Sequence, residues 1–230
     1  MNFVSHITDG RRLRALDLFC CEGGAGVGLH RAGFEVVGVD IQQRDRYPFE
    51  FHRADALEFP LEGFDFIWAS PPCQAHTIAQ KIRGNDHPDL IDPIRDRLCR
   101  SGIPYCIENV EGAPLRNPVM LCGSMFGIRT YRHRLFECSY PVQQPEHPKH
   151  EAPLRKMGRP VRDGEFMHIV GNFSGADLAR EIMGMPWASR DGLREAIPPV
   201  YSEYLGRAAI SHILNAALAP TITTKGQADE

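Results

Sequence analysis

The segment that decides the fold is Leu16-Asp17-Leu18-Phe19-Cys20-Cys21-Glu22-Gly23-Gly24-Ala25-Gly26-Val27-Gly28. Its apolar start is typical of a buried strand, and the glycines that follow are typical of a tight turn. Residues 26–32 then have the pattern of a short helix closed by Gly33, a residue that accepts the left-handed conformation of a helix end. A second apolar run, residues 35–40, follows directly. Strand, turn, helix and strand form one βαβ unit, which predicts an α/β protein with a parallel sheet.

The same alternation continues along the chain. We predict strands at residues 15–19, 35–40, 64–69, 105–110, 119–125 and 134–138. Most of these runs are apolar at successive positions, as expected for strands covered by helices on both faces. We predict a helix between the strands at residues 64–69 and 105–110, with Asp92 as its N-cap, Pro93 at its first position and Gly102 at its end. The α/β class therefore extends over at least the first 138 residues.

Composition and charge set further limits. The chain has 230 residues, of which 43% are hydrophobic, enough for one packed domain. No apolar run approaches the ~18 residues that span a bilayer, and residues 1–14 lack an apolar stretch of signal-peptide type. The seven cysteines form no Cys-x-x-Cys pair, so neither a disulfide framework nor a zinc knuckle is indicated. We expect a protein of the reducing cytoplasm with no membrane partner.

The positive charge is concentrated in one segment. Residues 129–162 carry eight Lys or Arg and three Glu, a net charge of +5, which leaves −8 for the remainder of a chain with net charge −3. Five prolines lie between positions 141 and 160, so we expect an irregular insert there. Helical periodicity returns at residues 200–219 and ends at Pro220. The basic insert is a candidate surface for phosphates.

Polar side chains stand at the predicted strand ends. Asp40 ends the second strand, 16 residues after Gly24, which is typical of an acid that binds the ribose of a nucleotide, although a tight turn with a solvated aspartate gives the same pattern. Asp55 follows a third possible strand and is a candidate for a ligand amine or a simple turn residue. A nucleotide site at the carboxyl edge of the sheet is therefore a hypothesis that needs further support.

That support comes from Ala69-Ser70-Pro71-Pro72-Cys73-Gln74, at the end of the strand predicted at residues 64–69. Two prolines stiffen the turn that presents the Cys73 thiol at the edge where open α/β folds bind ligands. Glu108-Asn109-Val110 ends the next strand, so a carboxyl and a thiol are expected to face one crevice. This pair suits nucleophilic attack with acid assistance, whereas an ion-pair role for Glu108 is the alternative. We interpret the other six cysteines as core residues.

Taken in order, these segments resemble the motifs of the DNA (cytosine-5)-methyltransferase family. The matching stretches are Asp17-Leu18-Phe19 with its glycines, Ser70-Pro71-Pro72-Cys73-Gln74, Glu108-Asn109-Val110, Arg132-His133-Arg134, Arg180-Glu181 with Gly184-Met185-Pro186, and Ala196-Ile197-Pro198-Pro199. The chain departs from the family at Thr130, where the family has Gln, and at Arg194-Glu195, where it has Gly-Asn. The resemblance implies a Rossmann-like class I S-adenosylmethionine-dependent methyltransferase sheet with a small irregular target-recognition insert.

The resemblance also implies roles for single residues. Cys73 would add to C6 of a flipped-out cytosine while Glu108 donates to N3, with Arg132 and Arg134 as further catalytic residues, and C5 would receive the methyl group of S-adenosylmethionine. The implied cofactor-binding residues are Phe19, Cys20, Gly23, Gly24, Asp40, Ile41, Asp55, Ala56, Pro72, Leu90 and Ala196. The implied DNA-binding residues are Gln74, Thr77, Lys81, Arg83, Asn109, Arg155, Lys156 and Arg159. We expect no metal site, because His147 and His150 alone, without further ligands, are typical of surface residues.

The predicted organisation follows from the order of the motifs. Residues 12–138 are expected to form the catalytic and cofactor-binding domain, 139–175 a short target-recognition insert, 176–220 a segment that returns to the catalytic domain, and 221–230 a frayed tail. Residues 74–91 are expected to be a loop that either closes over DNA, as in the family, or is a solvated surface loop.

The expected partner is double-stranded DNA and the expected state a monomer, in the cytoplasm of a bacterial or phage-infected host cell, in a setting such as restriction-modification. Two alternatives stay open: a transfer RNA cytosine-5 methyltransferase of the same family and a non-catalytic DNA-binding relative. A nicotinamide enzyme is disfavoured because the glycines lack Gly-x-Gly-x-x-Gly spacing.

Overall fold

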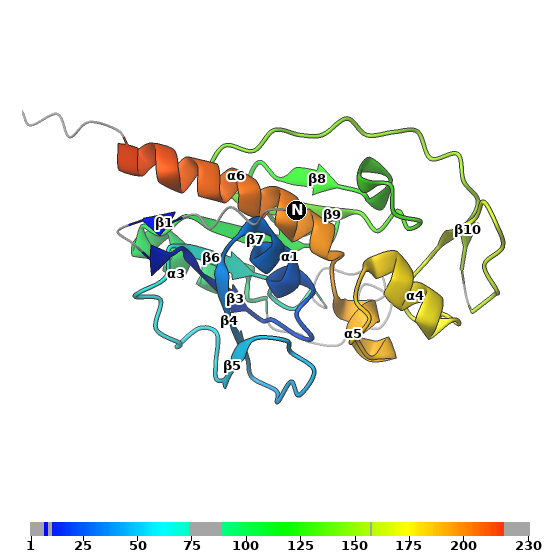
Figure 1. Cartoon of the computed structure of the whole chain (residues 1–230), viewed down its shortest axis with the longest axis horizontal. Coiled ribbons are helices and arrows are strands. Elements are labelled where there is room, and N and C mark those ends of the chain that lie inside the picture. Colours follow the sequence, from blue (N-terminus) through cyan, green and yellow to red (C-terminus); the bar gives the residue numbers. More distant parts are fainter. Residues whose placement is uncertain (1–6, 9–10, 74–88, 157, 219–230) are drawn as a thin grey trace, which may run out of the picture.

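A seven-stranded sheet forms the centre of the protein in the computed structural model, which describes residues 7–8, 11–73, 89–156 and 158–218 (Figure 1). The spatial order of its strands is β5-β4-β3-β6-β7-β9-β8. Their bounds are β3 Arg14–Leu18, β4 Glu35–Asp40, β5 Glu50–Arg53, β6 Phe66–Ala69, β7 Tyr105–Asn109, β8 Val119–Leu121 and β9 Arg134–Cys138. Strands β5, β4, β3, β6 and β7 are parallel, and β9 runs antiparallel to both β7 and β8. The predicted α/β class is confirmed.

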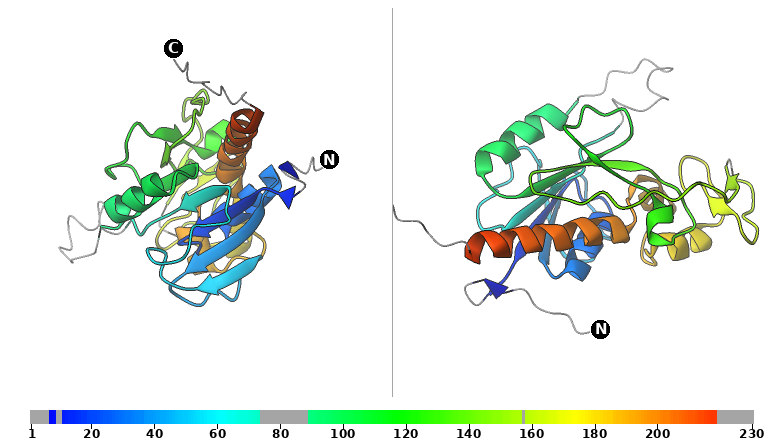
Figure 2. Two further views of the ribbon diagram at one scale, coloured as in Figure 1. Left: turned by 90° about the vertical axis from the view of Figure 1, so that its left-hand side faces the viewer. Right: turned by 90° about the horizontal axis from the view of Figure 1, so that it is seen from above.

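Helices cover both faces of this sheet (Figure 2). Helices α1 (Gly24–Ala32) and α6 (Pro199–Leu218) lie on one face, and α3 (Ile91–Ser101) lies on the other. Because successive side chains of a strand point to opposite faces, Trp68 packs into the core beneath α1 and α6 whereas Ile67 packs into the core beneath α3. This explains why the central strands are apolar at successive positions.

The C-terminal half adds a smaller apolar cluster beside the sheet. Helices α4 (Ala176–Met183) and α5 (Arg190–Glu195) contribute Ile182 and Leu193, and the preceding segment contributes Met167, Ile169 and Phe173. Among the described residues of the proline-rich insert, regular structure is limited to the two-residue strands β10 (Leu154–Arg155) and β11 (Phe166–Met167). Strands β1 (Ile7–Thr8) and β2 (Arg11–Arg12) form a similar short pair. None of the helices in the described ranges is long and apolar enough to cross a membrane.

Several predicted elements differ from the structure by a few residues at an end, and two of the differences have a clear physical cause. The strand predicted at residues 119–125 ends at Leu121, and Gly123–Phe126 forms a 3-10 helix, η2, in which a Cβ on Gly123 would lie 1.8 Å from the Thr130 carbonyl oxygen. The chain therefore turns back too tightly there for a strand to continue. Helix α3 begins at Ile91, with Leu90 as its N-cap, so the predicted cap at Asp92 is wrong by two residues; the backbone N–H of Ile91 donates to the Asp89 carboxylate over 3.0 Å. Asp92 instead pairs with Arg95.

Candidate active site

A cavity of about 500 Å³ lies at the carboxyl edge of the sheet, where strands β3, β4, β6 and β7 end. Thirteen of the residues proposed from the sequence line this cavity: Phe19, Cys20, Gly24, Asp40, Ile41, Asp55, Ala56, Pro72, Cys73, Leu90, Glu108, Arg134 and Ala196. Its volume lies within the range of roughly 300–1,000 Å³ that is usual for small-molecule sites. The fold therefore brings the two strand-end motifs and the glycine turn to one site.

The glycine turn forms one wall of the cavity through its backbone. Phe19 and Cys21 have positive φ angles of 59° and 47°, a conformation that is uncommon outside glycine and that clusters at functional sites. Gly23 has φ 83° and caps helix α1, and a Cβ there would lie 2.7 Å from Pro48 Cδ. Within the described residues, Gly23 is not part of the cavity wall, whereas Gly24 is. Gly23 therefore shapes the turn and Gly24 provides the surface.

Asp40 is held rigidly at the end of β4. Its two carboxylate oxygens accept backbone hydrogen bonds from Cys21 over 3.0 Å and from Gln42 over 2.9 Å. Arg44 Nε lies 3.1 Å from the same carboxylate. These contacts fix the acid against the glycine turn at the cavity that Asp40 lines, and each carboxylate oxygen has the capacity to accept a further hydrogen bond. Asp55 is in an exposed turn, where its carboxylate accepts from the Leu57 backbone over 2.8 Å.

Asp17 is a buried acid in the floor of the cavity. Its Oδ2 accepts a hydrogen bond from the Tyr47 hydroxyl over 3.1 Å, while Oδ1 has no hydrogen-bond partner among the residues that the structure describes. Burial disfavours the charged form and raises the pKa of Asp17 to about 7, with the Tyr47 hydrogen bond acting in the opposite direction. The sequence indicated Asp17 only as part of a motif, because the pattern of a single strand does not show that one oxygen of this carboxyl lacks a hydrogen-bond partner.

This raised pKa makes a prediction for stability. The pKa of Asp17 is about 7 in the folded state, whereas the ordinary value for this side chain is 3.8. The folded state therefore binds the Asp17 proton more tightly than the unfolded state does. Stability from this group is fully present below about pH 4 and is lost as pH rises through 7, to a total of about 4 kcal/mol. Asp17→Asn is therefore expected to flatten the fall in the free energy of unfolding between about pH 4 and 7, measured by urea unfolding.

The matched control for that experiment is Asp177→Asn, the same substitution at a side chain that is 99% exposed. Its free energy of unfolding should change with pH in parallel with that of the parent. Parallel curves for Asp17→Asn and the parent would show that Asp17 titrates normally.

Cys73, Glu108 and Arg134 form the reactive part of the site. Arg134 Nε lies 3.0 Å from Glu108 Oε1. Burial raises the pKa of Glu108, and the nearby Arg134 and Arg132 limit the rise. Burial first and the charge of Glu108 second raise the pKa of the Cys73 thiol, while Arg134 lowers it. The carboxyl is thus suited to hold a proton, and its protonated form is the one that least opposes a thiolate at Cys73.

The strand-end turn is held by polar contacts beneath it. Asn109 is 1% exposed and its side-chain amide donates to the Pro71 carbonyl over 3.0 Å. The Trp68 ring N–H donates to Ser70 Oγ over 2.8 Å, and the Ser70 side chain hydrogen-bonds Glu108. Asn109, proposed from the sequence as a DNA contact, is therefore buried and acts on the Pro-Pro turn that carries Cys73.

Arg132 differs from Arg134 in its placement. Its guanidinium donates to the Ile169 carbonyl over 2.6 Å and to the Arg194 carbonyl over 2.7 Å, and within the described residues it does not line the cavity. Burial and the charge of Arg134 lower the pKa of Arg132 to about 9, so it stays cationic at neutral pH. Arg132 therefore links the insert to α5. It lies next to the cavity and not in its lining, where the sequence analysis had proposed a catalytic role for it.

One wall of the cavity, formed by residues 194–197, contains residues that the sequence analysis did not assign to the site. Arg194, Glu195 and Ile197 line the cavity with Ala196, and Arg44 lines it opposite them. Glu22 fixes this wall, because its carboxylate accepts from the Ser189 backbone and hydroxyl, each over 2.6 Å. The two residues are 167 positions apart, so no local pattern could have revealed the contact.

The proposed DNA-binding residues fall into three groups. Gln74, Thr77, Lys81 and Arg83 lie outside the described residues, as does most of the loop predicted at residues 74–91. Arg155 Nε donates to a Glu165 carboxylate oxygen over 2.5 Å, so its charge is already paired. Lys156 and Arg159 are exposed on the same insert.

Comparison with solved structures identifies the fold. A protein described as a DNA modification methyltransferase, encoded within an E. coli prophage, aligns with a TM-score of 0.62 and 14% identity over 88% of this chain and 99% of that chain. The Entamoeba histolytica methyltransferase EhMeth aligns with a TM-score of 0.58 and 10% identity, covering 88% of this chain and 99% of its own. S. pombe Dnmt2 methyltransferase gives 0.56 and 13%, covering 90% and 100%.

In sequence, no family model and no curated protein matches the chain. At identities of 10–14% the structural likeness defines the fold and not the activity. The predicted class I S-adenosylmethionine-dependent methyltransferase fold is confirmed.

Proposed function

We propose that this protein is an S-adenosylmethionine-dependent methyltransferase that acts on C5 of cytosine in DNA. The observation that carries the proposal is that Cys73 lines one cavity together with Asp40 and with Glu108, whose carboxylate is ion-paired with Arg134. The family resemblance of the motifs and the likeness in fold to the prophage-encoded DNA modification methyltransferase and to S. pombe Dnmt2 methyltransferase support the same conclusion.

The cavity fits S-adenosylmethionine chemically. Asp40 is positioned to accept from ribose hydroxyls, and Phe19, Pro72 and Leu90 offer surfaces for the flat adenine ring. The unpartnered Oδ1 of Asp17 provides an acceptor for a cationic ligand. When bound, S-adenosylmethionine supplies an electrophilic methyl group.

The side chains of the chain itself then have three tasks. Cys73 Sγ forms a bond to C6 of a cytosine that has left the base stack. Glu108 donates its proton toward N3 as that bond forms, so that the electron pair of the C5–C6 double bond becomes available at C5 for methylation. Loss of the C5 proton to water, departure of Cys73 Sγ as a thiolate and return of the N3 proton to Glu108 restore the double bond and the neutral base. Arg134 stabilises the charged form of Glu108 while the proton is on N3.

The substrate is tested by offering both nucleic acids to one preparation. The purified chain with methyl-labelled S-adenosylmethionine is expected to label duplex DNA, and bisulfite sequencing is expected to place the label at C5 of cytosine. Label in transfer RNA alone would transfer the proposal to the RNA branch of the family. No label in either substrate would favour a non-catalytic DNA-binding protein.

We further propose that Lys156 and Arg159 contact DNA phosphates, because both are exposed cations of the basic insert and lie close in sequence to the ion-paired Arg155. Replacing both with alanine should weaken binding equally for all DNA sequences. Each lost phosphate contact should remove about 0.9 from the slope of log affinity against log salt. The slope is measured by fluorescence anisotropy over a range of salt concentrations.

A charge-matched control is the double variant Arg100→Ala and Arg207→Ala, which replaces two exposed arginines on α3 and α6. This variant should keep the slope of the parent, since neither residue is on the insert. An unchanged slope in the Lys156 and Arg159 variant would show that the insert is not the phosphate-binding surface.

A further inference from the structure

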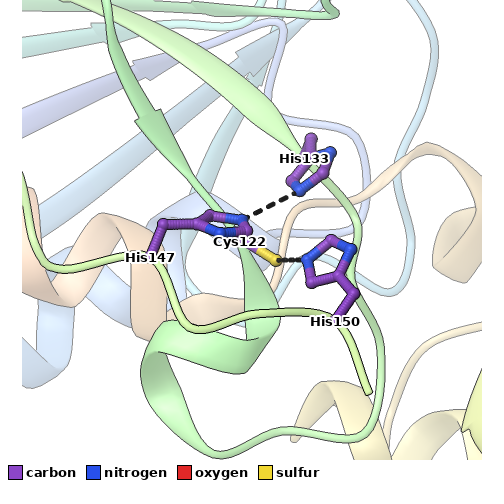
Figure 3. Close-up of side chains that lie close together, drawn as sticks. All are labelled: Cys122, His133, His147 and His150. Carbon is purple, nitrogen blue, oxygen red and sulfur yellow. Dashed lines mark hydrogen bonds between the residues drawn. The ribbon is translucent and has the colours of Figure 1, made fainter. Parts of the chain in front are cut away.

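Four side chains converge at the edge of the sheet, outside the cavity (Figure 3). Cys122 Sγ lies 3.3 Å from His150 Nε2, and His133 Nε2 lies 3.2 Å from His147 Nε2. One ligand atom from each of the four residues lies within 4.8 Å of the others. Thiol and imidazole groups that point at one another in this way are the donor set of transition-metal sites in proteins.

The four residues come from three separate parts of the chain. Cys122 follows β8 and precedes η2, and His133 directly precedes β9. His147 and His150 belong to the irregular insert and are separated by two residues. The sequence analysis considered only these two histidines, which are indeed exposed. The other two donors become visible only when β8 and β9 are paired at the edge of the sheet.

The spacing of the donor atoms matches a tetrahedral zinc site. With Zn–S near 2.3 Å and Zn–N near 2.0–2.1 Å, a tetrahedron has edges of about 3.6 Å between sulfur and nitrogen and about 3.4 Å between nitrogens. The two contacts of 3.3 Å and 3.2 Å agree with these edges within a few tenths of an ångström. The 4.8 Å limit on the other pairs is within reach of small side-chain rotations.

Neighbouring groups orient the histidine rings. The Nδ1 of His133 lies 3.5 Å from the Glu111 carboxylate, which favours a proton on Nδ1 and leaves Nε2 free to bind a cation. The ring of Tyr131 stacks on His150 with centroids 3.6 Å apart and an angle of 17°. Both contacts hold the rings with their Nε2 atoms turned toward the cluster.

We propose that Cys122, His133, His147 and His150 bind one zinc ion as a structural site. One thiolate and three imidazoles complete a four-coordinate shell, with no position left for substrate. The ion would fasten the insert to the β8–β9 edge, beside Arg132 and Arg134, and so fix where the basic insert lies relative to the cavity. The inference does not depend on the proposed activity, since it rests on the donor geometry alone.

The test uses the full, untagged chain. After purification from cells grown with zinc, elemental analysis is expected to find about one zinc ion per chain. Replacement of the zinc by cobalt(II) is expected to give the visible absorption of a tetrahedral site together with a near-ultraviolet band from thiolate ligation. Cys122→Ser should lose that thiolate band, and His150→Asn should lower the zinc content.

Matched controls are Cys99→Ser and His52→Asn, which change the same residue types at exposed positions outside the cluster. Both should keep the zinc content and the cobalt spectrum of the parent. Glu111→Gln should weaken zinc binding by about 10- to 100-fold while the ligands stay in place.

Two results would overturn the proposal. One is a parent protein that stays substoichiometric in zinc after incubation with an excess of the ion. The other is a cobalt-loaded parent without the thiolate band, a measurement on the unchanged chain that remains decisive even if Cys122→Ser fails to fold.

Discussion

Cys73→Ser is expected to abolish methyl transfer, with a fall in kcat of roughly three orders of magnitude or more. A serine hydroxyl is a far weaker nucleophile than a thiolate, and among the residues that the structure describes the cavity lining includes no histidine to activate it. The direct measurement is a covalent complex with duplex DNA that contains 5-fluorocytosine. In the presence of S-adenosylmethionine the fluorine prevents the last elimination, so the parent should form a complex that survives denaturation and the variant should not.

Cys99→Ser is the matched control, because Cys99 is exposed on α3 and lies outside the cavity. It should form the complex as the parent does. Binding of S-adenosylmethionine to Cys73→Ser, measured by calorimetry, should stay close to that of the parent and so separate a lost nucleophile from a collapsed site. A Cys73→Ser protein that traps DNA as fully as the parent would remove Cys73 from its proposed role.

The sheet could be predicted because its strands depend on local patterns. The bounds of β4 and β9 agree with the predicted runs at residues 35–40 and 134–138. The strand predicted at 119–125 was too long because its end depends on a contact between Gly123 and Thr130, which an apolar pattern does not contain. The start of α3 was predicted two residues too late because the N-cap position is occupied by Leu90, which is not a typical capping residue.

The candidate site was predictable as far as topology places strand ends together. Cys73 and Glu108 follow neighbouring parallel strands, so their meeting at one edge follows from the fold. The division of labour between Arg132 and Arg134 does not follow, because it depends on carbonyl groups 37 and 62 positions away. Long-range pairing likewise hid the Arg155 ion pair and the cluster at Cys122.

Glu108→Gln is expected to lower kcat by roughly 10²- to 10⁴-fold, the usual contribution of a general acid. The amide keeps the size of the carboxyl and can still hydrogen-bond Ser70, but it has no proton of comparable acidity to give to N3. Affinities for S-adenosylmethionine and DNA should change little. The loss should therefore fall in kcat, measured with saturating substrates.

A second readout separates this acid role from an effect on the thiol. The charge of Glu108 is one of the two main causes that raise the pKa of Cys73, so its removal should lower that pKa and speed alkylation of Cys73 by iodoacetamide at neutral pH. Mass spectrometry of the Cys73 peptide follows this reaction without interference from other cysteines. The control variant Glu203→Gln, on α6, should leave both the alkylation rate of Cys73 and kcat unchanged. A more reactive thiol combined with a slower enzyme would support a role for the proton of Glu108, because the loss of rate could not then come from a weaker nucleophile. Unchanged kcat in Glu108→Gln would instead assign the carboxyl to its ion pair with Arg134.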